Sequence, residues 1–362
     1  MALRDRLGRW LTFRFDPETA HDMAIAALKS GLVPGQRADA DPRLAVRTAG
    51  LAFPNPVGVA AGFDKNAQVP HALLAIGFGF AEIGTVTPRP QAGNRRPRVF
   101  RLAEAHAVIN RMGFNNAGHA VVRDRLSRRP AGGVVGVNIG ANADSQDRIA
   151  DYVSGLTEFY DLAGYFAVNI SSPNTPGLRA LQGRAQLAAL LERLSEARRG
   201  LIAQGRRRVP IFVKIAPDLE EGALDDIAAE VAAKDMDGMI VSNTTLARTG
   251  LARDPGQAGG LSGRPLFERA TIMLARTRQR VGPRMTLIGV GGVDSAAAAL
   301  AKIEAGADLV ELYTGMIYQG PQLAARILGG LSDRLDREGV SSIAALRDRK
   351  VEEWAARPLP GA

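Results

Sequence analysis

The stretch Thr286-Leu287-Ile288-Gly289-Val290-Gly291-Gly292 is a short apolar run that ends in two glycines and precedes a predicted helix opened by Asp294. The run is too short for a helix and is bounded by glycine, which predicts a buried β-strand. The same pattern occurs seven more times along the chain. The other predicted strands are Val57–Ala60, Ala81–Val86, Val134–Ile139, Tyr165–Ile170, Ile211–Ala216, Gly238–Ser242 and Asp308–Leu312.

Amphipathic stretches separate most of these runs. In Gln186–Ala203, for example, leucines recur along one side, as expected for a helix packed on a sheet. Eight strands with helical connections over about 300 residues predict a (β/α)8 TIM barrel, an α/β fold. An open doubly wound sheet is the alternative, but it gathers its ligand-binding residues at one crevice. Here polar and glycine-rich segments follow almost every strand, which favours the barrel.

Two long segments interrupt this alternation. Nearly fifty residues separate the second and third strands and include Pro88, Pro90 and Pro97, so we expect extra strands or a covering loop there. The segment Asn243–Pro265 is rich in Gly and Arg and is a candidate lid. The chain therefore divides into an N-terminal helical segment (residues 1–42), the barrel (43–340) and a C-terminal helix and tail (341–362).

The composition excludes several kinds of site. The chain has no cysteine, which rules out disulfides, thiolate nucleophiles and metal or iron–sulfur sites held by thiolates, and no metal site is predicted. The net charge of +9 comes from dispersed basic residues without an aromatic-interleaved motif, so we expect no nucleic-acid partner. No segment approaches the roughly 20 apolar residues needed to span a bilayer, and the start does not resemble an export signal. We expect the protein to stay inside the cell.

Residues 1–42 have a different character. A helix is predicted from Asp16 or Pro17 through Leu28. Before it, arginines interleave with aromatic and aliphatic residues, which is typical of an amphipathic helix on an anionic membrane surface. The same residues also fit a helix docked on the barrel with its arginines in water, and both interpretations stay open at this stage. The residues concerned include Arg4, Arg6, Arg9, Trp10 and Arg14.

Small and polar residues follow the predicted strands. Lys65 follows small residues beyond the first strand and can hold an anion. The pair Gly291-Gly292 and the string Tyr313-Thr314-Gly315 follow the seventh and eighth strands, where barrels often bind phosphate. Amide side chains suit a heterocycle with alternating N–H and C=O groups. Asparagines end several strands, at Asn138, Asn169 with Asn174, and Asn243.

Lys214 lies inside the otherwise apolar strand Ile211–Ala216. A buried ammonium group is costly unless it is paired with a charge or with a ligand that becomes anionic. A reduced flavin carries negative charge near N1, and a lysine held beside it would stabilise that state.

Four strings resemble motifs of the dihydroorotate dehydrogenase family and occur in family order, and the similarity covers essentially residues 15 to 330. A further string, Pro17-Glu18-Thr19-Ala20-His21, resembles the N-terminal helix of the quinone-dependent, membrane-associated class. The four strings are Gly84-Thr85-Val86-Thr87-Pro88-Arg89-Pro90, Ile109-Asn110-Arg111-Met112-Gly113-Phe114-Asn115-Asn116, Asn169 to Gly177, and Gly260-Leu261-Ser262-Gly263-Arg264-Pro265.

The resemblance implies a bound FMN and oxidation of (S)-dihydroorotate to orotate in pyrimidine (UMP) biosynthesis. It implies FMN contacts at Ala61, Lys65, Thr85, Asn138, Asn169, Lys214, Ser242, Gly263, Gly292, Tyr313 and Thr314. It implies substrate contacts at Lys65, Asn110, Arg111, Met112, Gly113, Phe114, Asn169, Asn174, Asn243 and Thr244, with Lys65 as partner of the orotate carboxylate.

In this reaction a base removes the C5 proton while hydride leaves C6 for flavin N5. The base is a cysteine in the soluble classes of the family. This chain has no cysteine, so the position falls to Ser172, as in the membrane class, and Thr175 resembles the family's proton-relay residue. A serine hydroxyl is a weak base and needs a shielded site with an outlet for its proton.

The same resemblance implies a tunnel for ubiquinone or menaquinone framed by the first forty or so residues. His21 and Arg101 match residues that line the quinone head-group site, and Tyr313 is expected between quinone and flavin. The implied location is peripheral, on the cytoplasmic face of the inner membrane, as a monomer or weak homodimer.

Two other functions compete with this one. A soluble FMN barrel with another acceptor, such as fumarate, is disfavoured by the missing cysteine and by the N-terminal segment. A sugar-phosphate barrel enzyme would explain the phosphate loops and Lys214 but not Asn169 to Asn174.

Overall fold

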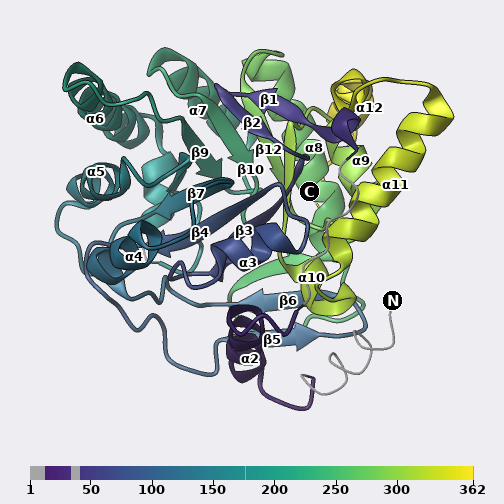
Figure 1. The fold of residues 1–362 in the computed structure, drawn as a ribbon, viewed down its shortest axis with the longest axis horizontal. Helices are drawn as coiled ribbons and strands as arrows, with labels where there is room; N and C mark the ends of the chain where they lie inside the picture. Colours follow the sequence, from purple (N-terminus) through teal and green to yellow (C-terminus); the bar gives the residue numbers. More distant parts are fainter. Residues whose placement is uncertain (1–12, 34–40, 176, 362) are drawn as a thin grey trace.

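The computed structural model describes residues 13–33, 41–175 and 177–361. Eight parallel strands close into a barrel in the spatial order β3-β4-β7-β8-β9-β10-β12-β13 (Figure 1), which confirms the predicted fold. The strands begin and end within one residue of the predicted runs, except that β3 continues four residues further. They are β3 (Val57–Asp64), β4 (Phe80–Val86), β7 (Val134–Ile139), β8 (Tyr165–Asn169), β9 (Ile211–Ile215), β10 (Gly238–Val241), β12 (Thr286–Val290) and β13 (Leu309–Leu312).

Helices follow the strands around the outside of the barrel (Figure 1). The predicted helix α9 begins at Ala296 rather than opening at Asp294, because the Ser295 hydroxyl caps it by accepting from the Ala298 N–H. Asp294 instead pairs with Arg264. The helices are α3 (Pro70–Ala75), α4 (Gly118–Ser127), α5 (Arg148–Phe159), α6 (Arg184–Ala203), α7 (Glu221–Ala233), α8 (Phe267–Val281), α9 (Ala296–Glu304), α10 (Thr314–Gln319) and α11 (Leu323–Glu338).

The barrel strands are buried along most of their length, as expected for parallel strands covered by helices. Glycine makes room inside the barrel at positions where a large ring crosses from the neighbouring strand. A Cβ atom at Gly58 in β3 would lie 2.4 Å from the ring of Phe80 in β4. The packing of the barrel therefore depends on the absence of a side chain at this position.

Gly58→Ala is expected to lower the free energy of unfolding by about 1–3 kcal/mol, because the new methyl group overpacks the barrel against Phe80. The matched control is Gly200→Ala. Gly200 lies within α6 with nothing near its Cβ position, so alanine there should stabilise the protein by about 0.5–1 kcal/mol. Urea unfolding of both variants checks the prediction, and equal effects would contradict it.

A small cap covers one end of the barrel. The two long segments supply an antiparallel sheet of β5 (Val99–Leu102), β6 (Ala107–Asn110) and β11 (Gly260–Gly263), which confirms the extra strands expected before residue 134. The helix α2 (Pro17–Lys29), capped by Asp16, lies beside this sheet (Figure 1). Glu18 of α2 pairs with the buried Arg98 at 2.9 Å, which fixes the helix to the cap.

Short elements complete the described chain. Before the barrel come a 3-10 helix (Pro42–Leu44) and the hairpin of β1 (Val46–Thr48) and β2 (Leu51–Phe53). After α11 comes α12 (Val351–Ala355), whose Trp354 packs edge-on against Phe267 of α8. The domain boundaries at residues 42 and 340 stay predictions.

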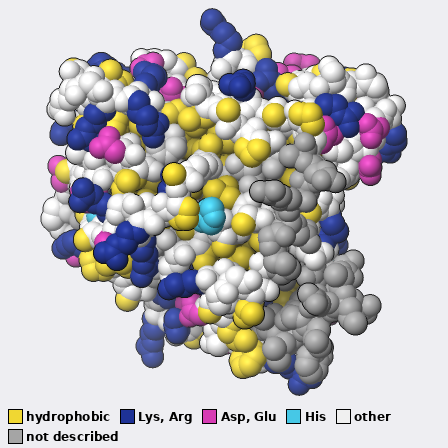
Figure 2. Space-filling model, viewed as in Figure 1, with side chains coloured by type: hydrophobic (Ala, Val, Ile, Leu, Met, Phe, Trp, Pro, Cys, Tyr) yellow, Lys and Arg dark blue, Asp and Glu magenta, His cyan; other side chains and the backbone are white. Residues whose placement is uncertain are grey.

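Figure 2 shows hydrophobic side chains exposed across the middle of one face, with Lys and Arg side chains around them. Within the described residues no helix is both long and apolar enough to cross a membrane.

Candidate active site

A cavity of about 750 Å³ lies between the barrel and its cap. Its walls come from α2, from the cap, and from the carboxyl ends of the barrel strands, where barrel enzymes place their active sites. Among the described residues it brings together nearly all of the predicted site residues. Those that line it are His21, Ala61, Lys65, Thr85, Arg101, Asn110, Met112, Gly113, Phe114, Asn169, Ser172, Asn174, Lys214, Ser242, Asn243, Thr244, Gly263, Gly292, Tyr313 and Thr314.

Three predicted residues do not line the cavity. Asn138 is buried behind it and accepts a hydrogen bond from the Thr85 hydroxyl at 2.6 Å. The guanidinium group of Arg111 donates to the carbonyl of Ala258 and lies over the ring of Phe100, within the cap. Thr175 is buried, and its hydroxyl has no hydrogen-bond partner among the described residues.

Glycines with positive φ form one end of the cavity. Gly263, Gly291 and Gly292 have φ angles of 96°, 105° and 75°, which a residue with a side chain rarely adopts. A Cβ atom at Gly292 would lie 2.4 Å from Phe267 Cβ. Next to them the Thr314 hydroxyl donates to the Ser262 hydroxyl at 2.8 Å. Open backbone and hydroxyl groups of this kind suit a phosphate group.

Amide side chains converge on the middle of the cavity. The Asn169 side chain donates to the Thr85 hydroxyl at 2.9 Å and accepts from the Ser171 hydroxyl at 3.0 Å. Asn174 donates weakly to the amide oxygen of Asn110, at 3.4 Å. These residues come from three different segments of the chain, so the predicted cluster of amides exists and forms a surface of mixed donors and acceptors.

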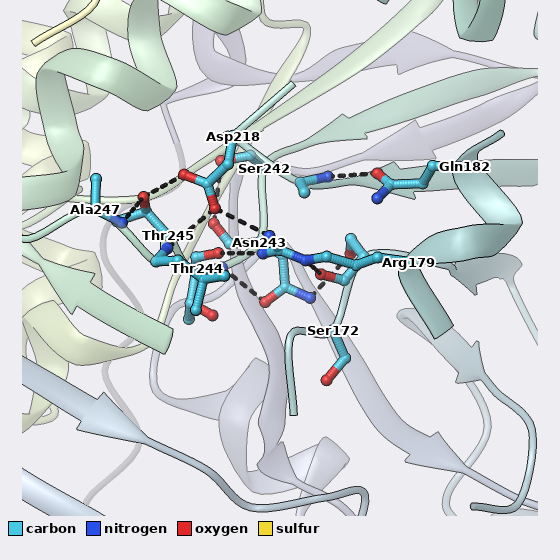
Figure 3. Close-up of polar contacts among 12 residues, drawn as sticks. Ser172, Arg179, Gln182, Asp218, Ser242, Asn243, Thr244, Thr245 and Ala247 are labelled. Atoms are coloured by element: carbon cyan, nitrogen blue, oxygen red, sulfur yellow. Dashed lines mark hydrogen bonds and ion pairs between the residues drawn. The ribbon is translucent and has the colours of Figure 1, made fainter. Parts of the chain in front are cut away.

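Ser172 lies in the loop after β8 and is almost completely buried. Its hydroxyl accepts a single hydrogen bond, from the Asn174 N–H at 3.3 Å. The neighbouring backbone is held in place by Arg179, which donates to the Ser171 carbonyl and pairs with Asp218 at 3.2 Å. In Figure 3 the Ser172 side chain points away from this Arg179–Asp218 cluster. These contacts hold the backbone next to Ser172, and Ser172 itself lines the cavity.

Asp218 also ties this loop to the segment after β10. It accepts from the Leu246 N–H at 3.0 Å and from the Thr245 hydroxyl (Figure 3). The candidate lid Asn243–Pro265 is therefore fixed at both ends, by Asp218 at its start and by β11 in the cap near its end. Whether the segment moves stays a prediction.

Lys65 is half-buried at the side of the cavity. Burial is the main cause that lowers its pKa to about 8, and the nearby Arg98 cation acts in the same direction. The carboxylates of Glu18 and Asp22 act in the opposite direction. A cation of this kind next to the amide cluster suits a carboxylate ligand.

Apolar residues of α2 line the outer part of the cavity, among them Ala24, Ile25 and Leu28. Where this part meets the barrel, His21 Nδ1 lies 3.3 Å from the Tyr313 hydroxyl. Burial, and secondarily the Lys65 cation, lower the pKa of His21 to about 3, so its imidazole is neutral at pH 7. Arg101 lies over the ring of Phe13, 4.7 Å from its centroid.

Two buried residues below the cavity were not among the predicted site residues. Glu82 of β4 and Glu311 of β13 are completely buried, and Lys214 Nζ lies 3.0 Å from Glu82 Oε1 and 3.7 Å from Glu311 Oε2. Both are charged residues inside predicted buried strands, which is the same signal that singled out Lys214. Lys214 is therefore paired with protein carboxyl groups as well as being open to the cavity.

Comparison with known proteins agrees with this geometry. The family model for dihydroorotate dehydrogenase matches residues 43–335. Proteins of Brucella ovis and of Brucella abortus strain S19, each named dihydroorotate dehydrogenase (quinone), are 62% identical to this chain over 362 residues, 99% of either chain.

Solved structures show the same similarity. The structure of an Eimeria tenella enzyme in complex with ferulenol superposes with a TM-score of 0.88 at 39% identity, covering 92% of this chain and 96% of that one. The ligand-free structure of that enzyme gives a TM-score of 0.87. This chain belongs to the dihydroorotate dehydrogenase family.

Proposed function

We propose that this protein oxidises (S)-dihydroorotate to orotate with a bound FMN and passes the electrons to a quinone, in pyrimidine biosynthesis. The observation that carries the proposal is a single cavity that joins the glycine loop, the amide cluster, Ser172 and Lys65 to an apolar opening beside α2. The 62% identity with proteins named dihydroorotate dehydrogenase (quinone) supports the same reaction.

The residues present fit FMN. The phosphate is assigned to the glycine loop with Gly263, Gly292 and Thr314. A Cβ atom at either glycine would collide with neighbouring atoms, so the backbone there stays open to a ligand. The flavin ring is assigned to Thr85, Asn169, Lys214 and their neighbours, which supply hydrogen-bond donors and a cation. FMN supplies the site with an acceptor for hydride and a carrier of two electrons.

The protein's own groups bind the substrate and move its proton. Lys65 is assigned to the substrate carboxylate, and Asn110, Asn174 and Asn243 to the polar edges of the ring. Ser172 takes the C5 proton, and Thr175, whose buried hydroxyl has no partner among the described residues, is the candidate to pass it on. Ser172 is almost completely buried, which shields its hydroxyl group from bulk solvent.

Anaerobic mixing with dihydroorotate tests the proposal. The purified protein should be yellow, should lose its flavin absorbance on addition of dihydroorotate, and should regain it when ubiquinone or menaquinone is added. Fumarate should not restore the colour. A colourless protein would favour a sugar-phosphate enzyme, and reoxidation by fumarate alone would favour the soluble class.

The quinone is assigned to the apolar opening between α2 and the barrel, beside His21, Arg101 and Tyr313. The exposed Phe15 and Leu32 at either end of α2 suit a peripheral position on the cytoplasmic face of the inner membrane. The basic and aromatic residues Arg4, Arg6, Arg9 and Trp10 lie outside the described residues. The monomer or weak homodimer stays a prediction.

His21→Ala is expected to lower kcat/KM for quinone about tenfold, because it removes the imidazole that contacts Tyr313 and Phe63. The rate of flavin reduction by dihydroorotate should stay within twofold of the wild-type rate. The control is His71→Ala, since His71 is exposed on α3. Steady-state assays with quinone and anaerobic stopped-flow assays separate the two half-reactions. A loss confined to flavin reduction would contradict the assignment.

A further inference from the structure

Four residues form a polar cluster in the barrel interior below the flavin site. Glu82, Tyr165, Lys214 and Glu311 come from β4, β8, β9 and β13, and none is more than 4% exposed. The rings of Phe80 and Phe212 lie beside Tyr165, at centroid distances of 6.3 and 5.1 Å. The cluster thus contains two completely buried carboxyl groups and one ammonium group that also faces the cavity.

The contacts of Tyr165 bear on the protonation of this cluster. Its hydroxyl oxygen lies 3.2 Å from Glu82 Oε2 and 3.2 Å from Glu311 Oε1. A phenol carries one hydrogen and donates to one of the two carboxyl groups. The other contact becomes a full hydrogen bond when that carboxyl group carries a proton and donates it to the Tyr165 oxygen. The geometry therefore accommodates one proton on the carboxyl pair.

The charges of the cluster also favour one proton on the two carboxyl groups. Two ionised carboxylates beside one ammonium group would leave a net negative charge buried in the barrel, which is unfavourable. Burial, and then the neighbouring Glu82, raise the pKa of Glu311 well above its ordinary value. Burial acts to lower the pKa of Lys214, but the two carboxyl groups opposite outweigh burial and raise it. The ammonium group stays charged and one carboxyl group stays protonated.

The contacts indicate which carboxyl group is ionised. Glu82 Oε1 accepts from Lys214 Nζ at 3.0 Å and from the Asn138 amide at 2.9 Å. Glu311 has only the longer 3.7 Å approach to Lys214, and its Oε2 atom has no hydrogen-bond partner among the described residues. Hydrogen-bond donors stabilise a carboxylate, so these contacts favour the charge on Glu82 and the proton on Glu311.

We propose that Glu82 and Glu311 form a proton-holding site below the flavin, in which one shared proton keeps the cluster electrically neutral around Lys214. The charge that Lys214 presents to the cavity is then balanced. Replacing either carboxyl group by an amide leaves the net charge of the cluster at zero, because the remaining carboxyl group ionises beside Lys214. The shared proton is a property of the protein alone, whereas its effect on the flavin rests on the proposed function.

Infrared spectroscopy of the wild-type holoenzyme tests the shared proton. With the glutamate carboxyl groups labelled with ¹³C, the carbonyl stretch of a protonated glutamate should be present at pH 7 and should shift with the label. The label separates this band from that of Asp64, a buried carboxyl group whose pKa burial raises. The band should disappear in Glu311→Gln and remain in Glu304→Gln, whose carboxylate is paired with Lys350 at 2.8 Å. Absence of a protonated glutamate in the wild type would overturn the proposal, even if the variants fail to fold.

The flavin potential provides a second test. In Glu82→Gln and in Glu311→Gln, spectroelectrochemistry should give a midpoint potential within about 30 mV of the wild type. For a two-electron couple this limit corresponds to less than a tenfold change in the ratio of reduced to oxidised flavin. If both carboxyl groups were ionised in the wild type, each variant would remove a negative charge below the flavin and shift the potential further in the positive direction, which would overturn the proposal. A protein without flavin would contradict the proposed function, while the infrared band would still report the shared proton.

Discussion

Ser172→Ala is expected to slow the reduction of flavin by dihydroorotate by about 10² to 10⁴-fold, the usual contribution of a general base. Among the described residues the hydroxyl accepts one hydrogen bond, the weak contact with Asn174, so its removal should leave the loop and the flavin in place. Anaerobic stopped-flow measurement of the flavin absorbance isolates this step from the reaction with quinone. The flavin content and the melting temperature should equal those of the wild type.

Ser172→Cys is the matched control for this prediction. A thiol has an ordinary pKa of about 8.5, so it ionises far more readily than a serine hydroxyl and supplies more of the deprotonated base near neutral pH. The cysteine variant should therefore keep more activity than the alanine variant, and its rate should level off at a lower pH than the wild-type rate. Equal rates of flavin reduction in Ser172→Ala and the wild type would refute Ser172 as the base.

Lys65→Met is expected to raise the KM for dihydroorotate about 10- to 100-fold. The change removes a charge-assisted contact with the substrate carboxylate, worth about 1.5–3 kcal/mol, while keeping a side chain of similar length. The control is Lys29→Met, because Lys29 is exposed in the last turn of α2. Its KM should not change. A wild-type KM in Lys65→Met would show that another group binds the carboxylate.

The pKa of Lys65 gives this prediction a pH dependence. Burial lowers the pKa to about 8, so the ammonium form dominates below pH 8 and is lost as the pH rises above it. Because the anionic substrate binds the ammonium form, KM should be constant from pH 6 to 7.5. Above pH 8 it should rise, approaching tenfold per pH unit. The variant Lys65→Met should show no such rise.

The pattern of the sequence by itself determined the fold, and the family resemblance of its motifs supplied most of the residues around the cavity. Short apolar runs ending in Gly, Asn or Ser predict buried strands. A run of four to eight apolar residues is too short for a helix, and the turn residues at its ends mark where the strand stops. The ends of parallel strands meet on one face of a barrel, so placing Asn169 and Lys214 on strands was enough to bring them together. The helix α2 was equally predictable from Asp16, Pro17 and its apolar side.

Only the tertiary structure decided which buried charges are paired. Glu82 and Lys214 are 132 residues apart, and their contact depends on the register of strands around the closed barrel, which no local pattern encodes. The same holds for Glu18 with Arg98 and for His21 with Tyr313, which join α2 to the cap and barrel. The periodicity of a strand shows that a side chain is buried, whereas its protonation is set by neighbours that come from distant strands. The sequence therefore specified a lysine inside a buried strand, and the closed barrel placed two glutamates beside it.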